Sequence, residues 1–111
     1  NTPLQSLIML NDLQVNEAAS ALAWSVINMN GLSPSERLKL AFAKIMTRQP
    51  SASELKLLAV YYEEEWVRLK SDLKSAKTLL KNPETNQNIP EAAALMLAIT
   101  AMYNMDDAVM M

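Results

Sequence analysis

The chain has 111 residues, of which 50% are hydrophobic and 20% charged, so it can bury one core and is not disordered. It contains no cysteine and no histidine, which removes most metal sites, covalent haem attachment and every catalytic pair that uses either residue. The formal net charge is −2, and the basic residues form no stripe of the kind that nucleic-acid-binding proteins need. We therefore expect no cofactor, no metal site and no nucleic-acid partner.

The residue types favour an all-α fold. The sequence has a single glycine, Gly31, whereas a β-protein of this size needs many tight turns and the glycines that form them. Alanine, leucine, lysine, glutamate and methionine, which are good helix formers, dominate the composition. We predict one helical domain over residues 1–111, a compact bundle of five or six helices with a buried, apolar C-terminal helix.

Two helices are predicted before Gly31. Thr2 can cap a short helix that begins at Pro3, because proline at the first helical position loses no hydrogen bond. Asn11–Asp12 either ends this helix or caps a second one, which we expect over residues 12–29, with Trp24 off its apolar stripe. The expected stripe consists of Val15, Ala18, Ala19, Leu22, Val26 and Met29.

Capping boxes mark the third and fourth helices. Ser33 precedes Pro34 and is followed by Glu36, the spacing at which serine and glutamate each bond the other's backbone amide. Ser51 and Glu54 repeat this pattern. The third helix is expected to end at Pro50 and to bury Leu38, Ala41, Phe42 and Ile45. The fourth, over residues 52–70, is expected to bury Leu55, Leu58, Ala59, Tyr62, Trp66 and Leu69.

The remaining chain predicts two more helices around a polar loop. Ser71–Asp72 can restart a short helix through Leu80, and residues 82–88 are polar, contain a proline and predict a mobile loop. The last helix begins at Pro90–Glu91 and has no charge from Ala92 to Met105, a run too short to span a bilayer. We expect it to be the central helix, with Ile99 in the core, and to close at residues 104–107.

Three blocks of the sequence resemble one family. The opening block comprises Thr2-Pro3-Leu4-Gln5-Ser6-Leu7, Leu10-Asn11-Asp12, Glu17-Ala18-Ala19 and Leu22-Ala23. The second comprises Arg37-Leu38, Ala41-Phe42, Arg48, Pro50 and Glu54-Leu55, and the third Asn104-Met105-Asp106-Asp107. Together they resemble a domain of unknown function from the C-terminal region of large planctomycete-type surface proteins, many with a cytochrome-c-like domain upstream. The resemblance implies an exported, multidomain bacterial parent, periplasmic or on the cell surface.

Most of the polar clusters have a structural explanation. Consecutive residues of a helix point about 100° apart, so Glu63-Glu64-Glu65 cannot converge on one ion and predicts a solvated face. Asn104 with Asp106-Asp107 offers too few oxygen ligands for calcium and predicts a helix end or a contact with a partner. The eight methionines are interpreted as flexible core filling rather than haem ligands.

No catalytic residue can be assigned, and three functions remain open. The first is a non-catalytic structural or interaction module that packs on the preceding domain of the parent protein. Because the chain begins at Asn1 rather than methionine, we expect a fragment from the C-terminal part of that parent, with possible weak self-association. The expected interaction surface consists of Leu4, Ile8, Met9 and Trp24.

The other two functions involve a ligand. The chain could contribute residues to an active site shared with the missing N-terminal region, for which Asn11, Asp12 and Arg37 are the polar candidates. Alternatively it could bind a small ligand such as a glycan through exposed aromatic side chains, of which Trp24 and Tyr61 lie off their helical stripes.

Overall fold

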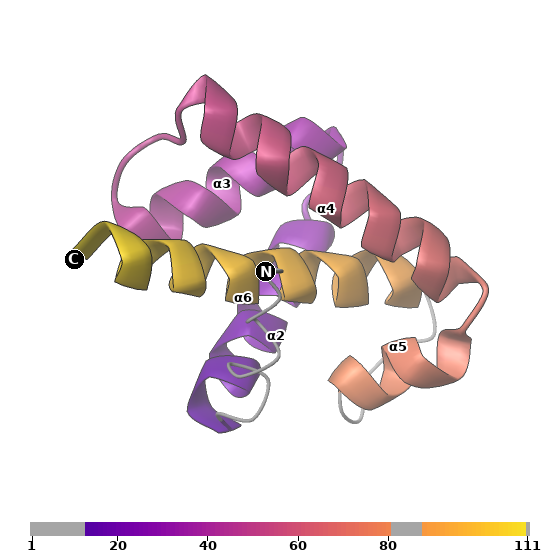
Figure 1. Ribbon diagram of the computed structural model, residues 1–111. Helices are drawn as coiled ribbons and strands as arrows, with labels where there is room; N and C mark the ends of the chain where they lie inside the picture. Colours follow the sequence, from indigo (N-terminus) through magenta and orange to yellow (C-terminus); the bar gives the residue numbers. More distant parts are fainter. Residues whose placement is uncertain (1–12, 81–87, 111) are drawn as a thin grey trace.

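The computed structural model describes residues 13–80 and 88–110, and the described side chains are those of residues 16–80 and 88–105. These residues form helices and no strand, so the predicted all-α fold is confirmed for this part of the chain (Figure 1). The predicted helix at residues 2–10 and the predicted mobile loop lie outside it, apart from Asn88 at the loop's end. The helices are α2 (Leu13–Ile27), α3 (Pro34–Met46), α4 (Ala52–Lys70), α5 (Leu73–Leu80) and α6 (Ile89–Met110).

Both predicted capping boxes are present and fix where α3 and α4 begin. The backbone amide of Ser33 donates to Glu36 Oε1 at 2.8 Å, and the amide of Glu36 donates to Ser33 Oγ at 3.1 Å. The pair Ser51–Glu54 has the same two distances. Each box satisfies amides that a helix start would otherwise leave without partners.

Helix α3 ends earlier than Pro50. Its last residue is Met46, and Thr47 adopts a left-handed backbone with φ of 56°, from which its amide still donates to the carbonyl of Ala43. The prediction that the proline ends the helix is therefore wrong by one turn. A left-handed residue closes a helix by itself, which leaves residues 48–50 free to form the connection to α4.

Helix α2 buries a different face from the predicted one. Ala18 and Met29, assigned to the stripe, are exposed, and Leu22 is only half-buried. The face towards the core is turned by about one residue, or roughly 100°. Because small apolar residues surround most of this helix, its sequence defines the buried direction poorly. The buried residues are Asn16, Ala19, Ala23, Val26 and Ile27.

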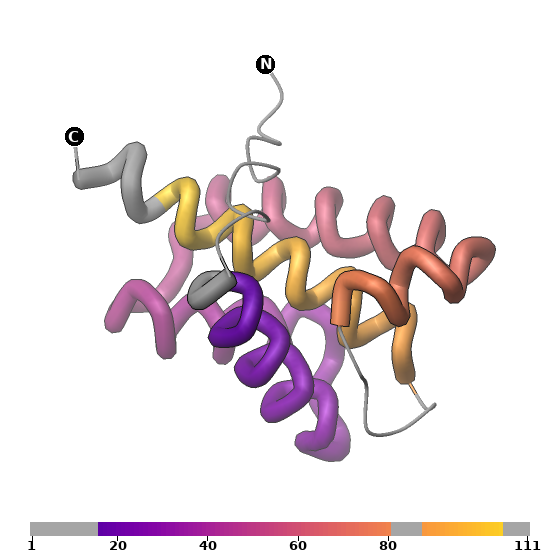
Figure 2. The backbone as a smooth tube through the Cα atoms, turned by 90° about the horizontal axis from the view of Figure 1, so that it is seen from below, coloured from indigo at the N-terminus to yellow at the C-terminus, as the bar shows by residue number. Residues whose placement is uncertain are grey.

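Helix α6 is the centre of the bundle and contacts each of the other four described helices. Figure 2 shows it running between α2 and α4. Every residue from Ala92 to Thr100 is buried, as is Met102. Helix α2 makes extensive contact with α6. Buried alanine side chains on both helices allow the two backbones to approach closely.

The C-terminal helix does not close at residues 104–107 as predicted, because α6 continues to Met110. Asparagine and aspartate favour helix ends only weakly when no glycine or proline follows them, and neither occurs after Pro90. Met96 and Met102 are buried and Met105 is half-buried, which agrees with their interpretation as core filling. Among the described helices, none is long and apolar enough to cross a membrane.

Helix α4 has the predicted bounds and the predicted inner face. Leu58, Tyr62 and Leu69 are buried, and the other members of the stripe are half-buried against the core. Asp72 accepts hydrogen bonds from the amide and hydroxyl of Ser75 and so caps α5, of which Ala76 and Leu80 are buried.

Phe42 and Ile99 are both completely buried, as predicted. We expect Phe42→Ala to lower the free energy of unfolding by about 3–5 kcal/mol and Ile99→Ala by about 2–5 kcal/mol, because each removes buried atoms and leaves a cavity. Chemical denaturation followed by circular dichroism measures both. Leu73→Ala is the control, since this side chain on α5 is 49% exposed and its loss should change stability by no more than about 0.5 kcal/mol. Equal effects at all three positions would contradict the assigned core.

Candidate functional site

The charged residues of the second family-like block, Arg37, Arg48 and Glu54, make contacts that join helices. Arg37 lies in the first turns of α3, and its side chain is only 16% exposed. Its Nη1 donates to the hydroxyl of Tyr62 on α4 at 3.3 Å and lies 3.5 Å from Oε2 of Glu91 on α6. One guanidinium therefore connects three helices near the N-terminal end of α6.

The surroundings of Arg37 keep Tyr62 neutral. Burial raises the pKa of the Tyr62 hydroxyl, and the hydrogen bond and positive charge of Arg37 oppose this rise only in part. The ring of Tyr62 also stacks on Trp66 with centroids 6.2 Å apart. A neutral tyrosine hydroxyl next to a paired arginine is suited to positioning helices and has no activated base beside it.

One atom of this cluster is not satisfied within the bundle. Arg37 Nε is buried and has no hydrogen-bond partner among the described residues. A buried donor without a partner is uncommon and costs free energy. The Arg37 cluster thus links three helices and also presents a hydrogen-bond donor, Nε, that could bind a group from outside the described residues.

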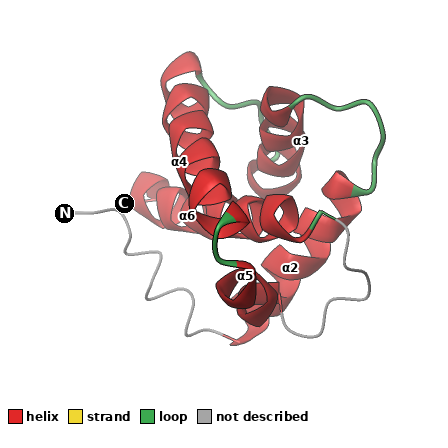
Figure 3. Ribbon diagram, turned by 90° about the vertical axis from the view of Figure 1, so that its right-hand side faces the viewer, coloured by secondary structure: helices red, strands yellow, loops and turns green. Residues whose placement is uncertain are grey.

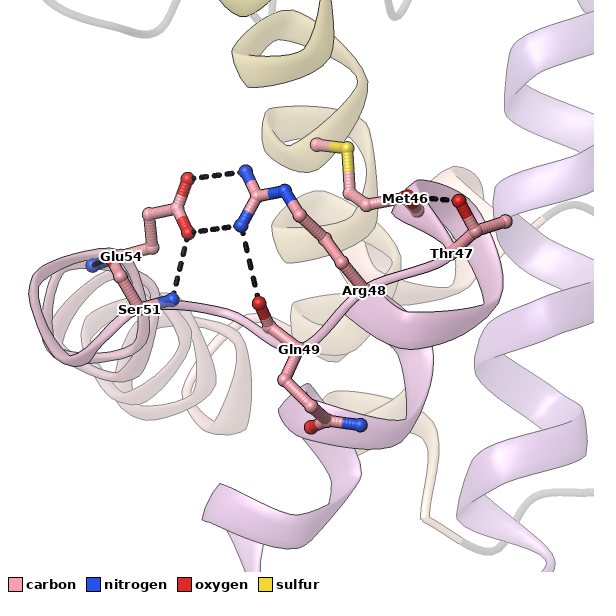
Figure 4. Close-up of polar contacts among 6 residues, drawn as sticks. All are labelled: Met46, Thr47, Arg48, Gln49, Ser51 and Glu54. Carbon is pink, nitrogen blue, oxygen red and sulfur yellow. Dashed lines mark hydrogen bonds and ion pairs between the residues drawn. The ribbon is translucent and has the colours of Figure 1, made fainter.

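A second arginine contact shapes the connection between α3 and α4 (Figure 4). Nη1 and Nη2 of Arg48 donate to the two carboxylate oxygens of Glu54, each at 2.9 Å, and Nη1 also donates to the carbonyl of Gln49 at 3.2 Å. The guanidinium lies over the ring of Phe42, 5.0 Å from its centroid. The carboxylate that caps α4 therefore also holds the preceding turn against the core.

The sequence alone points to both residues but not to the contact between them. The spacing predicts that Glu54 forms a capping box with Ser51, whereas Arg48 stands out only as a residue of the second family-like block. The signal was their spacing of six residues on either side of Pro50, where the chain must turn back between two helices. The bidentate geometry depends on the left-handed Thr47, which the sequence does not predict.

The other predicted site residues are less informative. Leu4, Ile8, Met9, Asn11 and Asp12 lie outside the described residues. Trp24 is half-buried against the core rather than freely exposed, and so is Tyr61. Both aromatic rings therefore offer less surface to a ligand than their position off the helical stripes predicts.

The acidic cluster Glu63-Glu64-Glu65 lies on the solvated face that was predicted for it. Glu63 and Glu64 are exposed, and Glu65 pairs with Arg68 one turn later, with Nε of the arginine 2.8 Å from Oε1. The side chains of Asp106 and Asp107 are not among those described. Within the described part of the chain, no group of three acidic, cysteine or histidine residues lies close enough to hold a metal ion.

The comparisons identify the family. Residues 1–62 match the model of PSD1, whose description is "Protein of unknown function (DUF1553)". The chain belongs to the PSD1 family. The match covers α2, α3 and α4 as far as Tyr62, so it includes Arg37, Arg48 and Glu54, whose contacts are described above. No curated protein and no solved structure matches this PSD1 chain.

The contact between Arg37 and Tyr62 should appear as non-additive effects of their substitutions on the free energy of unfolding. We expect Arg37→Met to lower the free energy of unfolding by about 1–3 kcal/mol, because it leaves Glu91 and the Tyr62 hydroxyl without their partner. Tyr62→Phe should cost about 0.5–1.5 kcal/mol, and the double variant less than the sum of the two. Additive losses in denaturant titrations would show that the hydrogen bond contributes nothing.

Because of the Arg48 contact, the free energy of unfolding should depend on pH in the acid range. The hydrogen bonds from Arg48, with the amide of Ser51, lower the pKa of Glu54 from 4.5 to about 2. Between these values the unfolded chain binds a proton that the folded chain does not, so stability falls as the pH falls. The stability difference between the wild type and Glu54→Gln should be constant above pH 4.5 and should shrink towards pH 2.

Thermal unfolding at a series of pH values measures this difference. Glu17→Gln is the matched control, because Glu17 is an exposed carboxylate on α2. Its stability profile should follow that of the wild type through the acid range. A constant difference between the wild type and Glu54→Gln down to pH 2 would show that the pair with Arg48 does not form in solution.

Proposed function

We propose that the chain is a non-catalytic structural or interaction module of a larger exported bacterial protein, and that it packs on the domain preceding it. The observation that carries this proposal is the use of Arg37, Arg48 and Glu54, which join helices of the module to one another. An active site would instead need charged groups gathered around a reacting centre. The absence of cysteine and histidine from the sequence is in keeping with this function.

The proposed contact surface lies at the start of the chain. Leu4, Ile8 and Met9 belong to an apolar stretch of sequence that precedes α2, and Trp24 of α2 is only half-buried. An apolar patch of this kind on a folded module is typical of an interface. By the family resemblance, the parent is a planctomycete-type protein of the periplasm or cell surface, with a cytochrome-c-like domain upstream.

The second candidate function is a contribution to a shared active site. The unsatisfied Nε of Arg37 favours it, because a group from the preceding domain could accept that hydrogen bond. Asn11 and Asp12 remain the other candidates. In this case the module would complete a site whose chemistry resides in the rest of the parent.

A longer form of the protein tests the main proposal. The chain alone should bind a hydrophobic dye while folded, and a form that carries the preceding domain should bind much less, because the apolar surface is covered. The variant Leu4→Ser/Ile8→Ser should lower dye binding by the chain alone. Lys77→Glu, at an exposed position on α5, is the control and should change nothing.

Two results would count against the main proposal. Equal dye binding by the short and long forms would mean that the preceding domain does not cover the module. Loss of an activity of the parent in Arg37→Lys, with unchanged thermal stability, would instead support the shared active site.

A further inference from the structure

Helix α4 has a second apolar face that points away from the core. Leu57, Val60 and Val67 are 60%, 49% and 56% exposed, whereas Leu58, Tyr62 and Leu69 of the same helix are buried. At about 100° per residue, the exposed set lies roughly opposite the buried one. Figure 3 shows α4 at an edge of the bundle, with α3 beside it and α6 passing below it.

The exposed residues follow the spacing of a helix-pairing seam. Leu57, Val60, Glu64 and Val67 are separated by three, four and three residues, which is the heptad pattern by which two helices pack side by side. A helix with its core on one side and this pattern on the other can pack against a further helix.

The charges beside the seam include both signs on one edge, so the edge of one copy can pair with the same edge of a second copy. Lys56 and Glu63 are both exposed and lie seven residues apart, hence on the same edge of the seam. Neither forms an ion pair within the described part of the chain. Lys70, which follows on the same edge, lies 5.2 Å over the ring of Trp66 and is occupied there.

We propose that two copies of this chain associate through the outer faces of their α4 helices, arranged antiparallel about a two-fold axis. In this arrangement Leu57 of each copy packs on Val60 of the other, and Lys56 of each pairs with Glu63 of the other. Two ion pairs then flank a small apolar centre, and every contact occurs twice, as two-fold symmetry requires.

The charges select this register over its rivals. Parallel helices would bring Glu64 against Glu64 in the seam, where like charges repel. An antiparallel pair shifted by one heptad would place Lys56 opposite Lys70, and Glu63 opposite Glu63. In the proposed register Glu64 faces the small, polar Ser53 of the other copy, which leaves its carboxylate hydrated.

The association is weak because the contact is short. It uses about three turns of each helix and is therefore at or below the lower end of specific protein interfaces. It is independent of the proposed docking on the preceding domain, which uses the first segment and α2. A dimer can thus form whether or not that docking occurs.

Charge reversal tests the pairing directly in the chain itself. Sedimentation over a wide concentration range should show a monomer–dimer equilibrium for the wild type. Lys56→Glu and Glu63→Lys should each weaken dimerisation by roughly tenfold, since two attractive pairs become repulsive. The double variant Lys56→Glu/Glu63→Lys should restore it, and Lys77→Glu on α5 should have no effect. Circular dichroism confirms that every variant is folded.

Disulfide trapping provides an independent test, because the chain has no cysteine of its own. A mixture of Leu57→Cys and Val60→Cys chains should form the mixed disulfide faster than either variant forms a disulfide with itself. A wild type that is monomeric at all concentrations overturns the proposal and leaves the outer face of α4 for another partner. A dimer whose dissociation constant is unchanged by both charge reversals also overturns the proposal, because that dimer uses a different surface.

Discussion

The burial of α6 is the constraint on which the rest of the structure depends. From Ala92 to Met105 this helix carries no charge, and its residues from Ala92 to Thr100 are buried. An uncharged helix that does not cross a membrane is stable in water only when other helices cover it on every side. The four other described helices do this, and each contacts α6. Its central position follows from the hydrophobic effect more than from any single contact.

Covering one helix with several others leaves the problem of fixing their relative positions. Apolar packing is non-directional, so a bundle built only from alanine, leucine and methionine could slide between alternative arrangements. Two arginines provide directional contacts: Arg37 links α3 to α4 and α6, and Arg48 fixes the turn between α3 and α4. Both belong to the segment matched by the PSD1 family model. Their function in this fold is therefore to position the helices that surround α6.

Helix α4 presents apolar residues on two opposite sides. Its inner face contributes Leu58, Tyr62 and Leu69 to the core, and its outer face exposes Leu57, Val60 and Val67. Exposed apolar residues at heptad spacing on a well-formed helix are a feature of helix pairing. The molecule thus separates two tasks, because charged residues within the bundle fix its shape while apolar residues outside it remain available for contacts.

The local sequence pattern correctly predicts the class of fold, the capping boxes of α3 and α4, the bounds of α4, and the burial of Phe42 and Ile99, because capping and helical periodicity are local properties. It did not determine the buried face of α2, where small apolar residues surround most of the helix, or the left-handed turn at Thr47. The Arg48–Glu54 and Arg37–Tyr62–Glu91 contacts were also decided only in the tertiary structure. They join residues from different helices, and their geometry depends on how those helices pack around α6 rather than on any local pattern.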